Sequence, residues 1–184
     1  MQVIQTELDG VLIVEPRVFV DGRGYFFESF NARDFARETG LDIVFVQDNE
    51  SRSSYGVVRG LHFQKPPHAQ SKLVRVVEGR VLDVAVDLRR SSPSFGRYVA
   101  VELTGENHRQ IFIPKGFAHG FAVLSKEAVF QYKCDSLYCP KAEGAIAWDD
   151  PDIGIDWKLP AADIILSAKD RKHPILRESD FFFD

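Results

Sequence analysis

Short apolar segments separated by turn residues are the feature of this sequence that most limits how the chain can fold. Each segment is rich in β-branched or aromatic residues, and most are bounded by Gly, Pro, Asp or Ser, which is typical of β-strands. The expected strands are Val11–Val14, Val18–Val20, Tyr25–Phe30, Ile43–Gln47, Val57–Phe63, Leu73–Val77, Val81–Leu88, Tyr98–Leu103, Gln110–Ile113, Gly120–Val123 and Val129–Lys133. Many evenly spaced short strands predict an all-β sandwich or barrel rather than a βαβ sheet.

One helix is expected, beginning after Asn31 and ending before Gly40. Asn31 can cap its N-terminus, with Asp34 at the capping-box position, and Gly40 can end it. Phe30 and Phe35 can form a hydrophobic staple across the cap.

The length of 184 residues predicts a single domain, residues 1–184, with a sizeable core. No repeat, low-complexity segment or linker divides the chain. The run Phe181–Phe183 is too apolar for a free tail, so we expect it to pack back onto the domain or onto a partner.

Charge and cysteine content exclude several classes of protein. The formal net charge of −4 argues against non-specific nucleic-acid binding, so any phosphate site must come from local cations. No apolar run approaches the ~18 residues of a membrane-spanning helix, and the N-terminus lacks the apolar core of a signal peptide. Cys134 and Cys139 are too few for a disulfide framework and do not form a CxxC motif. We therefore expect free thiols and a cytoplasmic location.

The stretch RGLHFQKPPHAQSKLVRV concentrates histidines and cations where a sheet is expected. Its members are Arg59, His62, His68, Lys72 and Arg75. They form either an exposed basic edge or a site that binds a multiply charged anion and moves a proton. Strict alternation would separate Arg59 from His62, unless Gly60 hosts a bulge that redirects one side chain.

The strand after Gly79 places Asp83 and Asp87 on one face, together with small apolar residues. That face could line a polar cavity inside a barrel, or it could face solvent.

The segment IPKGFAHGF, which ends just after His119, resembles the second half of the cupin signature, PxGxxH. Cupins are small β-barrel proteins, and those that bind metal carry an HxH pair in the first half of the signature. This chain has His62-Phe-Gln64 at that place. His62, His68 and His119 could be proposed as ligands of a transition metal, but the standard first pair is broken, and we expect no metal.

Two tyrosines and an aspartate complete the candidates. Tyr132 could donate a proton if it is held opposite a base, although a core position beside Phe130 is the alternative. Tyr138 lies in an expected loop, where it could serve as an aromatic platform. Asp170 matters only if the fold brings it to His62, where a carboxylate would fix the tautomer of the imidazole.

A series of blocks carries a more specific resemblance. In order, they are DGRGYFFESF, FVQDNES, VVRGLHFQKPPHAQSKLVRVVEGRVLDVAVDLR, SPSFGRYVAVEL, IPKGFAHGF, YKC…YCP, WDDPDIGIDW and LSAKD. Together they resemble the dTDP-4-dehydrorhamnose 3,5-epimerase family from about residue 1 to 175. Blocks in a fixed order are stronger evidence than any single motif.

The resemblance implies a cupin-type jelly-roll barrel with a few short helices, acting as a homodimer without metal or other cofactor. It implies dTDP-4-dehydro-6-deoxy-D-glucose as the substrate and dTDP-4-dehydro-β-L-rhamnose as the product. The implied catalytic residues are His62 as the base, Asp170 as its partner, Tyr132 as the acid and Lys72 beside the developing enolate. The implied substrate-binding residues are Arg23, Glu28, Gln47, Asp48, Asn49, Arg59, His119, Glu143 and Lys169, with Tyr138 stacking on thymine. In the family, N-terminal strands reach into the neighbouring subunit's site, and Arg23 and Glu28 match those positions.

The chemistry agrees with this set of residues. Inverting a carbon beside a ketone requires a base, an acid on the opposite side, and a cation or donor near the carbonyl oxygen. The alternatives are an epimerase that inverts one carbon only, a metal-dependent cupin isomerase or oxygenase, and a sugar-nucleotide-binding jelly roll without catalysis. Metal content and uptake of deuterium from solvent would separate them.

Overall fold

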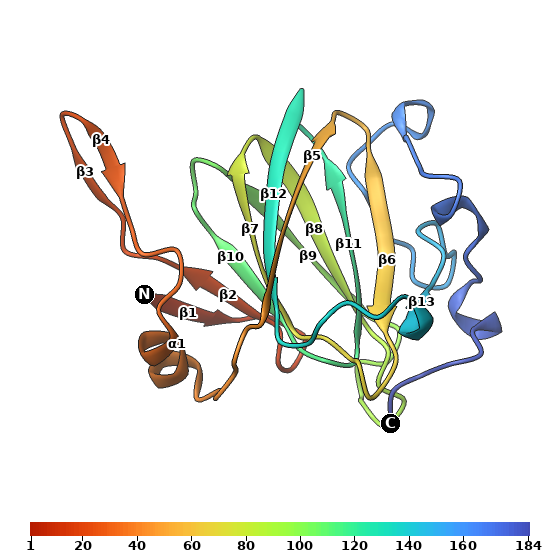
Figure 1. Cartoon of the computed structure of the whole chain (residues 1–184). Helices are drawn as coiled ribbons and strands as arrows, with labels where there is room; N and C mark the ends of the chain where they lie inside the picture. The colour runs from red at the N-terminus through yellow and green to blue at the C-terminus, as the bar shows by residue number, and fades with distance from the viewer.

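Two antiparallel β-sheets face each other and form a jelly-roll barrel in the computed structural model, which describes residues 1–184 (Figure 1). The six-stranded sheet has the order β1 (Gln2–Gln5), β2 (Leu12–Glu15), β10 (Gln110–Ile113), β7 (Lys72–Glu78), β12 (Glu127–Cys134) and β5 (Gln47–Ser54). The five-stranded sheet has the order β13 (Glu143–Ala145), β6 (Val58–Gln64), β11 (Phe117–Val123), β8 (Arg80–Asp87) and β9 (Tyr98–Thr104). A hairpin of β3 (Phe19–Asp21) and β4 (Gly24–Phe26) stands away from the barrel (Figure 1). The predicted all-β jelly-roll class is confirmed.

The barrel interior and the outer face of the five-stranded sheet are separate hydrophobic cores. Strand β8 shows the division, because Val81 and Ala85 belong to the interior core while Leu82, Val84 and Val86 belong to the outer one. The interior face of β8 is also the face that carries Asp83 and Asp87, and both are fully buried. The interpretation of this face as a lining of the barrel is therefore confirmed.

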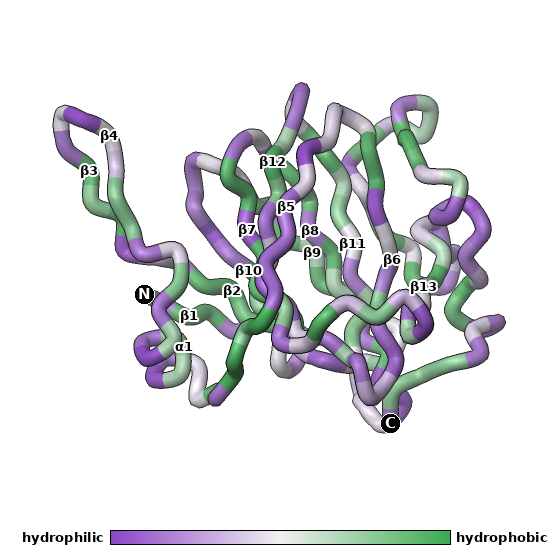
Figure 2. The backbone as a smooth tube through the Cα atoms, viewed as in Figure 1, coloured by the Kyte–Doolittle hydropathy of each residue, from purple (hydrophilic) through white to green (hydrophobic).

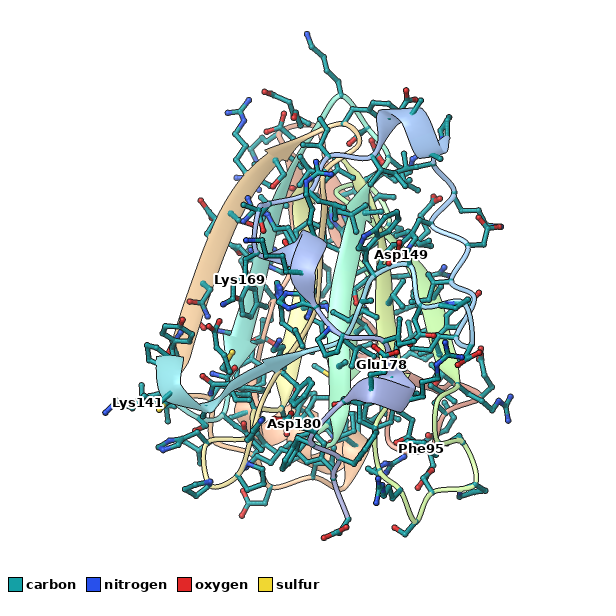
Figure 3. All side chains as sticks on the ribbon, turned by 90° about the vertical axis from the view of Figure 1, so that its right-hand side faces the viewer. Phe95, Lys141, Asp149, Lys169, Glu178 and Asp180 are labelled. Carbon is teal, nitrogen blue, oxygen red and sulfur yellow. The ribbon has the colours of Figure 1, made fainter.

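The segment after β13 covers the outer face of the five-stranded sheet (Figure 3). The short 3₁₀ helices are η1 (Pro140–Ala142), just before β13, and, within the segment, η2 (Ala161–Asp163), η3 (Asp170–Lys172) and η4 (Leu176–Glu178). Near its end, Phe181 stacks on Phe63 of β6 at 5.9 Å between ring centroids, and Phe183 meets the same ring edge-on at 5.7 Å. The expected packing of the Phe181–Phe183 run onto the domain is confirmed.

The predicted helix forms as α1 (Ala32–Thr39). The side chain of Asn31 accepts a hydrogen bond from the backbone N–H of Asp34, and Gly40 ends the helix in the left-handed conformation with φ of 73°. The rings of Phe30 and Phe35 lie 5.7 Å apart across the cap, as the staple requires. Helix α1 covers one end of the outer face of the six-stranded sheet.

The strand prediction fails around residue 47. Ile43–Gln47 was expected as a strand, but residues 41–46 have no regular structure and strand β5 begins at Gln47. The sequence of β5, QDNESRSS, is polar on both faces, as its hydrophilic colour in Figure 2 shows, so it lacks the apolar alternation that marks a strand. The short strands β1 and β13 were also missed.

Cys134 and Cys139 are both free thiols, as predicted. No helix in the structure combines the length and the apolar character needed to cross a membrane.

Candidate active site

A cavity of about 660 Å³ opens between the two sheets, and we call it the main cavity. Its walls come from β5, β6, β7, β11, β12 and the segment that covers the outer sheet. The lining includes Asn49, Ser51, Arg59, His62, Lys72, His119, Phe121, Phe130, Tyr132, Ser167, Lys169 and Asp170. All four predicted catalytic residues therefore lie around one space, although strands from both sheets and a distant segment supply them.

Gly60 is the reason that Arg59 and His62 both line the main cavity. The pairing of β6 with β11 is irregular here, since Arg59 lies opposite Phe121 while His62 lies opposite His119. Strand β6 thus carries one more residue than its partner, and the alternation of side chains changes phase. Gly60 has φ of 131°, and a Cβ there would lie 2.6 Å from the Cα of Gly120. The bulge predicted at Gly60 is confirmed, and only glycine fits it.

His62 and Asp170 form a hydrogen-bonded pair although 108 residues separate them in the chain. The Nε2 atom of His62 lies 2.6 Å from Oδ1 of Asp170, while Ser167 donates its hydroxyl to Oδ2 at 2.8 Å. Burial alone would raise the pKa of Asp170, but the hydrogen bonds from His62 and Ser167 lower the pKa to about 2. The carboxylate is therefore charged at neutral pH and leaves the other ring nitrogen of His62 to accept a proton.

His119 takes part in a second pair, with Asp83. The Nε2 atom of His119 lies 3.1 and 3.0 Å from the two carboxylate oxygens of Asp83, and its Nδ1 atom lies 3.5 Å from Nζ of Lys72. Burial lowers the pKa of His119 and also the pKa of Lys72. Both ring nitrogens of His119 have partners, so it is less available as a base than His62.

Tyr132 faces the main cavity from β12, on the sheet opposite His62. Its ring lies 6.0 Å from that of Phe130, and Nζ of Lys72 lies 5.8 Å from its centroid. Burial raises the pKa of the phenol, so the hydroxyl stays protonated at neutral pH. Tyr132 packs beside Phe130, as expected for a core tyrosine, and it also lines the main cavity, as expected for a proton donor.

Arg59 supplies a guanidinium at the cavity wall. Its Nε and Nη2 atoms donate to Oγ of Ser53 on β5, at 3.2 and 3.1 Å. Ser53 was not a candidate from sequence, because it belongs to the missed strand β5. Two other predicted members of the basic cluster lie elsewhere: Arg75 lines a cleft of about 270 Å³ outside the barrel, and His68 is exposed in the loop before β7. His68 is thus not near His62 and His119, and the three-histidine metal set does not form.

The remaining predicted binding residues cluster at one end of β5 and beyond it. Gln47 donates to Oδ1 of Asn49 at 2.9 Å and accepts from the backbone N–H of Tyr138 at 2.8 Å. Asn49 lines both the main cavity and the outer cleft, whereas Asp48 lines the outer cleft alone and pairs with Lys133. The loop position predicted for Tyr138 is confirmed, and its side chain is exposed.

A side cavity of about 370 Å³ adjoins the main one. Lys169 and His62 line both spaces, and Glu143 pairs with the ammonium group of Lys169 at their boundary. Figure 3 looks onto this side of the molecule, with Lys169, Glu178 and Asp180 labelled.

Arg23 and Glu28 do not lie in the main cavity of their own chain. Arg23 sits in the turn of the projecting hairpin, where it pairs with Asp21, and Glu28 accepts from the side chain of Asn31. Both positions are compatible with the expectation that these residues serve a neighbouring subunit.

His62, Asp170 and His173 are the one group with atoms suited to hold a metal ion, and their ligand atoms lie within 4.8 Å of one another. Two ligands of a tetrahedral ion with bonds of 2.0–2.2 Å would be about 3.4 Å apart. The 2.6 Å between His62 and Asp170 is instead a hydrogen-bond distance. The geometry fits proton sharing better than metal coordination.

Comparison with known proteins identifies the family. A protein-family model described as dTDP-4-dehydrorhamnose 3,5-epimerase matches residues 5–178. The chain belongs to the dTDP-4-dehydrorhamnose 3,5-epimerase family. The family resemblance expected from the ordered sequence blocks is thereby confirmed.

Three relatives show how closely the chain follows dTDP-4-dehydrorhamnose 3,5-epimerases. The enzyme of that name from Methanothermobacter thermautotrophicus is 54% identical over 180 residues, which cover 97% of this chain and 96% of the relative. The crystal structure of the epimerase from Elizabethkingia anophelis matches with a TM-score of 0.94 and 53% identity, over 98% of this chain and 99% of that one. The structure of dTDP-6-deoxy-D-glucose-3,5-epimerase from Legionella pneumophila, in complex with dTDP-4-keto-L-rhamnose, matches with a TM-score of 0.94 and 49% identity, over 97% and 94%.

Proposed function

We propose that this chain inverts C3 and C5 of dTDP-4-dehydro-6-deoxy-D-glucose and so forms dTDP-4-dehydro-β-L-rhamnose, in the synthesis of dTDP-L-rhamnose. Family membership over nearly the whole chain supports the reaction. The single structural observation that carries the mechanism is the pairing of His62 with Asp170 on one wall of a cavity that Tyr132 lines from the other.

His62 acts as the base. Both C3 and C5 adjoin the C4 ketone, so loss of either proton gives an enolate and no redox partner is needed. Asp170 orients the imidazole and stabilises the imidazolium that forms when the proton is taken. Ser167 holds the carboxylate in place.

Lys72 and His119 stabilise the enolate. Negative charge develops on the C4 oxygen in the transition state, and donors fixed in advance in a water-poor site lower its energy. Lys72 lies beside His119 on the cavity wall, and Asp83 fixes the tautomer of His119 from behind. This makes Asp83 a positioning residue. No role was assigned to it from the sequence, which left open whether its face lines a cavity or meets solvent.

Tyr132 returns the proton on the opposite face of the sugar. Inversion requires two faces, because a single base would give the proton back to the side from which it took it. Tyr132 belongs to the six-stranded sheet and His62 to the five-stranded sheet, so the sugar ring would lie between them.

Arg59 binds the diphosphate, and residues at the end of β5 bind the nucleoside. Guanidinium groups clamp phosphate oxygens with two parallel hydrogen bonds. Asn49 lines the main cavity and Glu143 the side cavity, while Gln47 accepts a hydrogen bond from the backbone of Tyr138, whose exposed ring could stack on thymine.

A second copy of the chain completes the site in this proposal. The hairpin of β3 and β4 exposes Val20 (78%), Tyr25 (59%) and Phe26 (67%), which is a large apolar surface for a free hairpin. Pairing with another subunit would cover these side chains and bring Arg23 and Glu28 to its cavity.

The experiment that tests the function is NMR spectroscopy of dTDP-4-dehydro-6-deoxy-D-glucose with the protein in D₂O. We expect deuterium at both C3 and C5, followed by signals of the doubly inverted sugar. Deuterium at one carbon only would indicate a single-position epimerase. If neither carbon exchanged its proton although the protein bound dTDP, the result would indicate a sugar-nucleotide-binding protein without catalysis.

A further inference from the structure

His62 must be reset between the two inversions, if the proposed function holds. Each inversion leaves His62 with one proton more than it had and Tyr132 with one fewer, which bulk solvent must replace. The imidazolium formed at the first carbon cannot serve as base at the second. In the proposed mechanism the singly inverted sugar stays in the main cavity during this interval. The surplus proton therefore needs a way out that the bound sugar does not block.

The side cavity offers such a route. His62 lines both cavities, and its side chain is 39% exposed although its partner Asp170 is only 5% exposed. Charged and polar groups surround the side cavity, among them Lys65, Glu178 and Asp180, which suits it to hold water. Its lining also includes His173.

His173 shares the carboxylate of Asp170 with His62. Its Nε2 atom lies 3.3 Å from Oδ1 of Asp170, the same oxygen that His62 contacts at 2.6 Å. The two imidazole rings meet edge-on, with centroids 5.7 Å apart. The side chain of His173 is 12% exposed, so it is held firmly at the wall of the side cavity. The hydrogen bonds from His62, Ser167 and His173 each lower the pKa of Asp170, so the carboxylate attracts the His62 proton less strongly than it would without His173.

We propose that the side cavity is the proton-exchange port of His62, and that His173 is a positioning residue that speeds the release. In this step the His62 imidazolium gives the proton on Nδ1, the nitrogen that took it from the sugar, to a water molecule in the side cavity, while Nε2 keeps its hydrogen bond to Asp170. The product is neutral imidazole and a hydronium ion that leaves to bulk solvent, and no electrons are transferred. The inference rests on the proposed function, because only an enzyme that inverts two carbons in one binding event needs the reset.

A single-turnover experiment separates the two inversions. Enzyme in excess is mixed with dTDP-4-dehydro-6-deoxy-D-glucose, quenched at intervals, and the singly and doubly inverted sugars are quantified. In His173→Phe we expect the first inversion to stay within about twofold of the wild-type rate and the second to slow by about tenfold or more, the low end of the effect of an acid–base group. The KM should be unchanged, and the singly inverted sugar should accumulate. Imidazole buffer should accelerate the second inversion in proportion to its concentration.

Three further variants make the test specific. Glu178 lines the same cavity but has no hydrogen bond to Asp170, so in Glu178→Gln both inversions should keep their wild-type rates. His173→Asn retains an N–H donor and should recover part of the second rate. Ala145→Leu narrows the side cavity from a position opposite His62 in the pairing of β13 with β6 and removes no partner of Asp170. It should therefore slow the second inversion more than the first, even if His173→Phe fails to fold.

The outcomes distinguish the port from the function. Equal slowing of both inversions in a folded His173→Phe, or a second inversion unaffected in both His173→Phe and Ala145→Leu, would overturn the port and leave the epimerase proposal standing. A wild-type chain that inverts neither carbon would overturn the proposed function and the port together.

Discussion

Tyr132 and His62 line the same cavity from opposite sheets of the barrel. Each sheet therefore supplies one of the two groups that exchange protons with the sugar. The six-stranded sheet supplies the Tyr132 phenol, which stays protonated, and the five-stranded sheet supplies the His62 imidazole, which is bound to Asp170. A jelly roll suits a reaction that moves protons across a ring, because its interior is bounded by two rigid walls.

Tyr132→Phe should separate proton removal from inversion. The variant keeps the ring that packs beside Phe130 and removes only the hydroxyl. We expect a folded protein that binds dTDP and exchanges substrate protons with D₂O through His62, but forms little inverted product. NMR of the substrate in D₂O measures both quantities. Normal epimerisation by this variant would remove Tyr132 from the mechanism.

His62→Ala should mainly lower turnover, whereas Arg59→Ala should mainly weaken the binding of dTDP. The first should lower kcat by about 10²–10⁴-fold with dTDP affinity nearly intact, because it removes a positioned acid–base group. The second should weaken dTDP binding, because the diphosphate loses its bidentate partner. Calorimetry measures the affinity for dTDP, and steady-state kinetics measure kcat. Arg52→Ala is a matched control, since Arg52 lies on β5 in an exposed pair with Glu127. If His62→Ala lost dTDP binding while Arg59→Ala kept it, the catalytic and binding roles assigned to His62 and Arg59 would be reversed.

Chelation should leave the activity unchanged. The expectation comes from His62-Phe-Gln64 in place of HxH and from the hydrogen-bond distance between His62 and Asp170. Activity is assayed after treatment with a chelator and after addition of zinc, iron or manganese. A loss that one of these metals restores would contradict a mechanism based on proton transfer alone.

Mixing two inactive variants tests whether subunits share residues. If Arg23 acts in the partner's cavity, a mixed dimer of His62→Ala and Arg23→Ala contains one site with both changes and one intact site. Random mixing should then restore roughly a quarter of the wild-type activity, since half of the dimers are mixed and each has one working site. Assays before and after co-refolding provide the comparison. No recovery, in a preparation shown to contain mixed dimers, would place Arg23 outside the shared site.

Asp87 should contribute acid-sensitive stability. Burial alone would raise its pKa, but hydrogen bonds from Arg89, Ser92 and Ser94 lower the pKa from 3.8 to about 2. Because the folded-state pKa is lower than the unfolded one, the contribution is present above the unfolded pKa and is lost as the pH falls towards 2. It amounts to about 2 kcal/mol. Urea unfolding of wild type and Asp87→Asn should therefore show a gap at pH 6 that closes in acid, while the exposed Asp149→Asn shows none. A gap independent of pH would mean that the Asp87→Asn substitution perturbs packing only.

The sequence was most informative where a residue's neighbours along the chain determine its structure. Asn31 and Gly40 bound the helix as predicted, and Gly60 produces the bulge that brings Arg59 to the side of His62. Both features depend on local backbone conformation, which glycine and capping residues make visible in a sequence.

The sequence was least informative where a side chain acts through a distant partner. Four residues were not named as site residues: Asp83, Ser53, Ser167 and His173. Asp83 contacts His119, 36 residues away, and Ser53 belongs to a strand that was missed. Ser167 and His173 contact their near neighbour Asp170, but they join the site only through the bond of Asp170 to the distant His62. Strand β5 was missed for a related reason. A strand that lines a polar cavity has no apolar face, so the pattern that reveals buried strands is absent.

The order of strands and the late position of Asp170 in the chain limit how early in folding the active site can form. Strand β5 pairs only with β12, and β2 pairs with β10 as well as with its chain neighbour β1, so several neighbours in the sheet come from distant parts of the chain. Chains with such high contact order fold on the slow, millisecond-to-second side of the range, since long loops must close before their contacts form. The bond between His62 and Asp170 spans 108 residues and cannot form until the C-terminal segment has packed against β6. The dyad is thus a late event of folding, and no partly folded intermediate that lacks the C-terminal segment has a competent base.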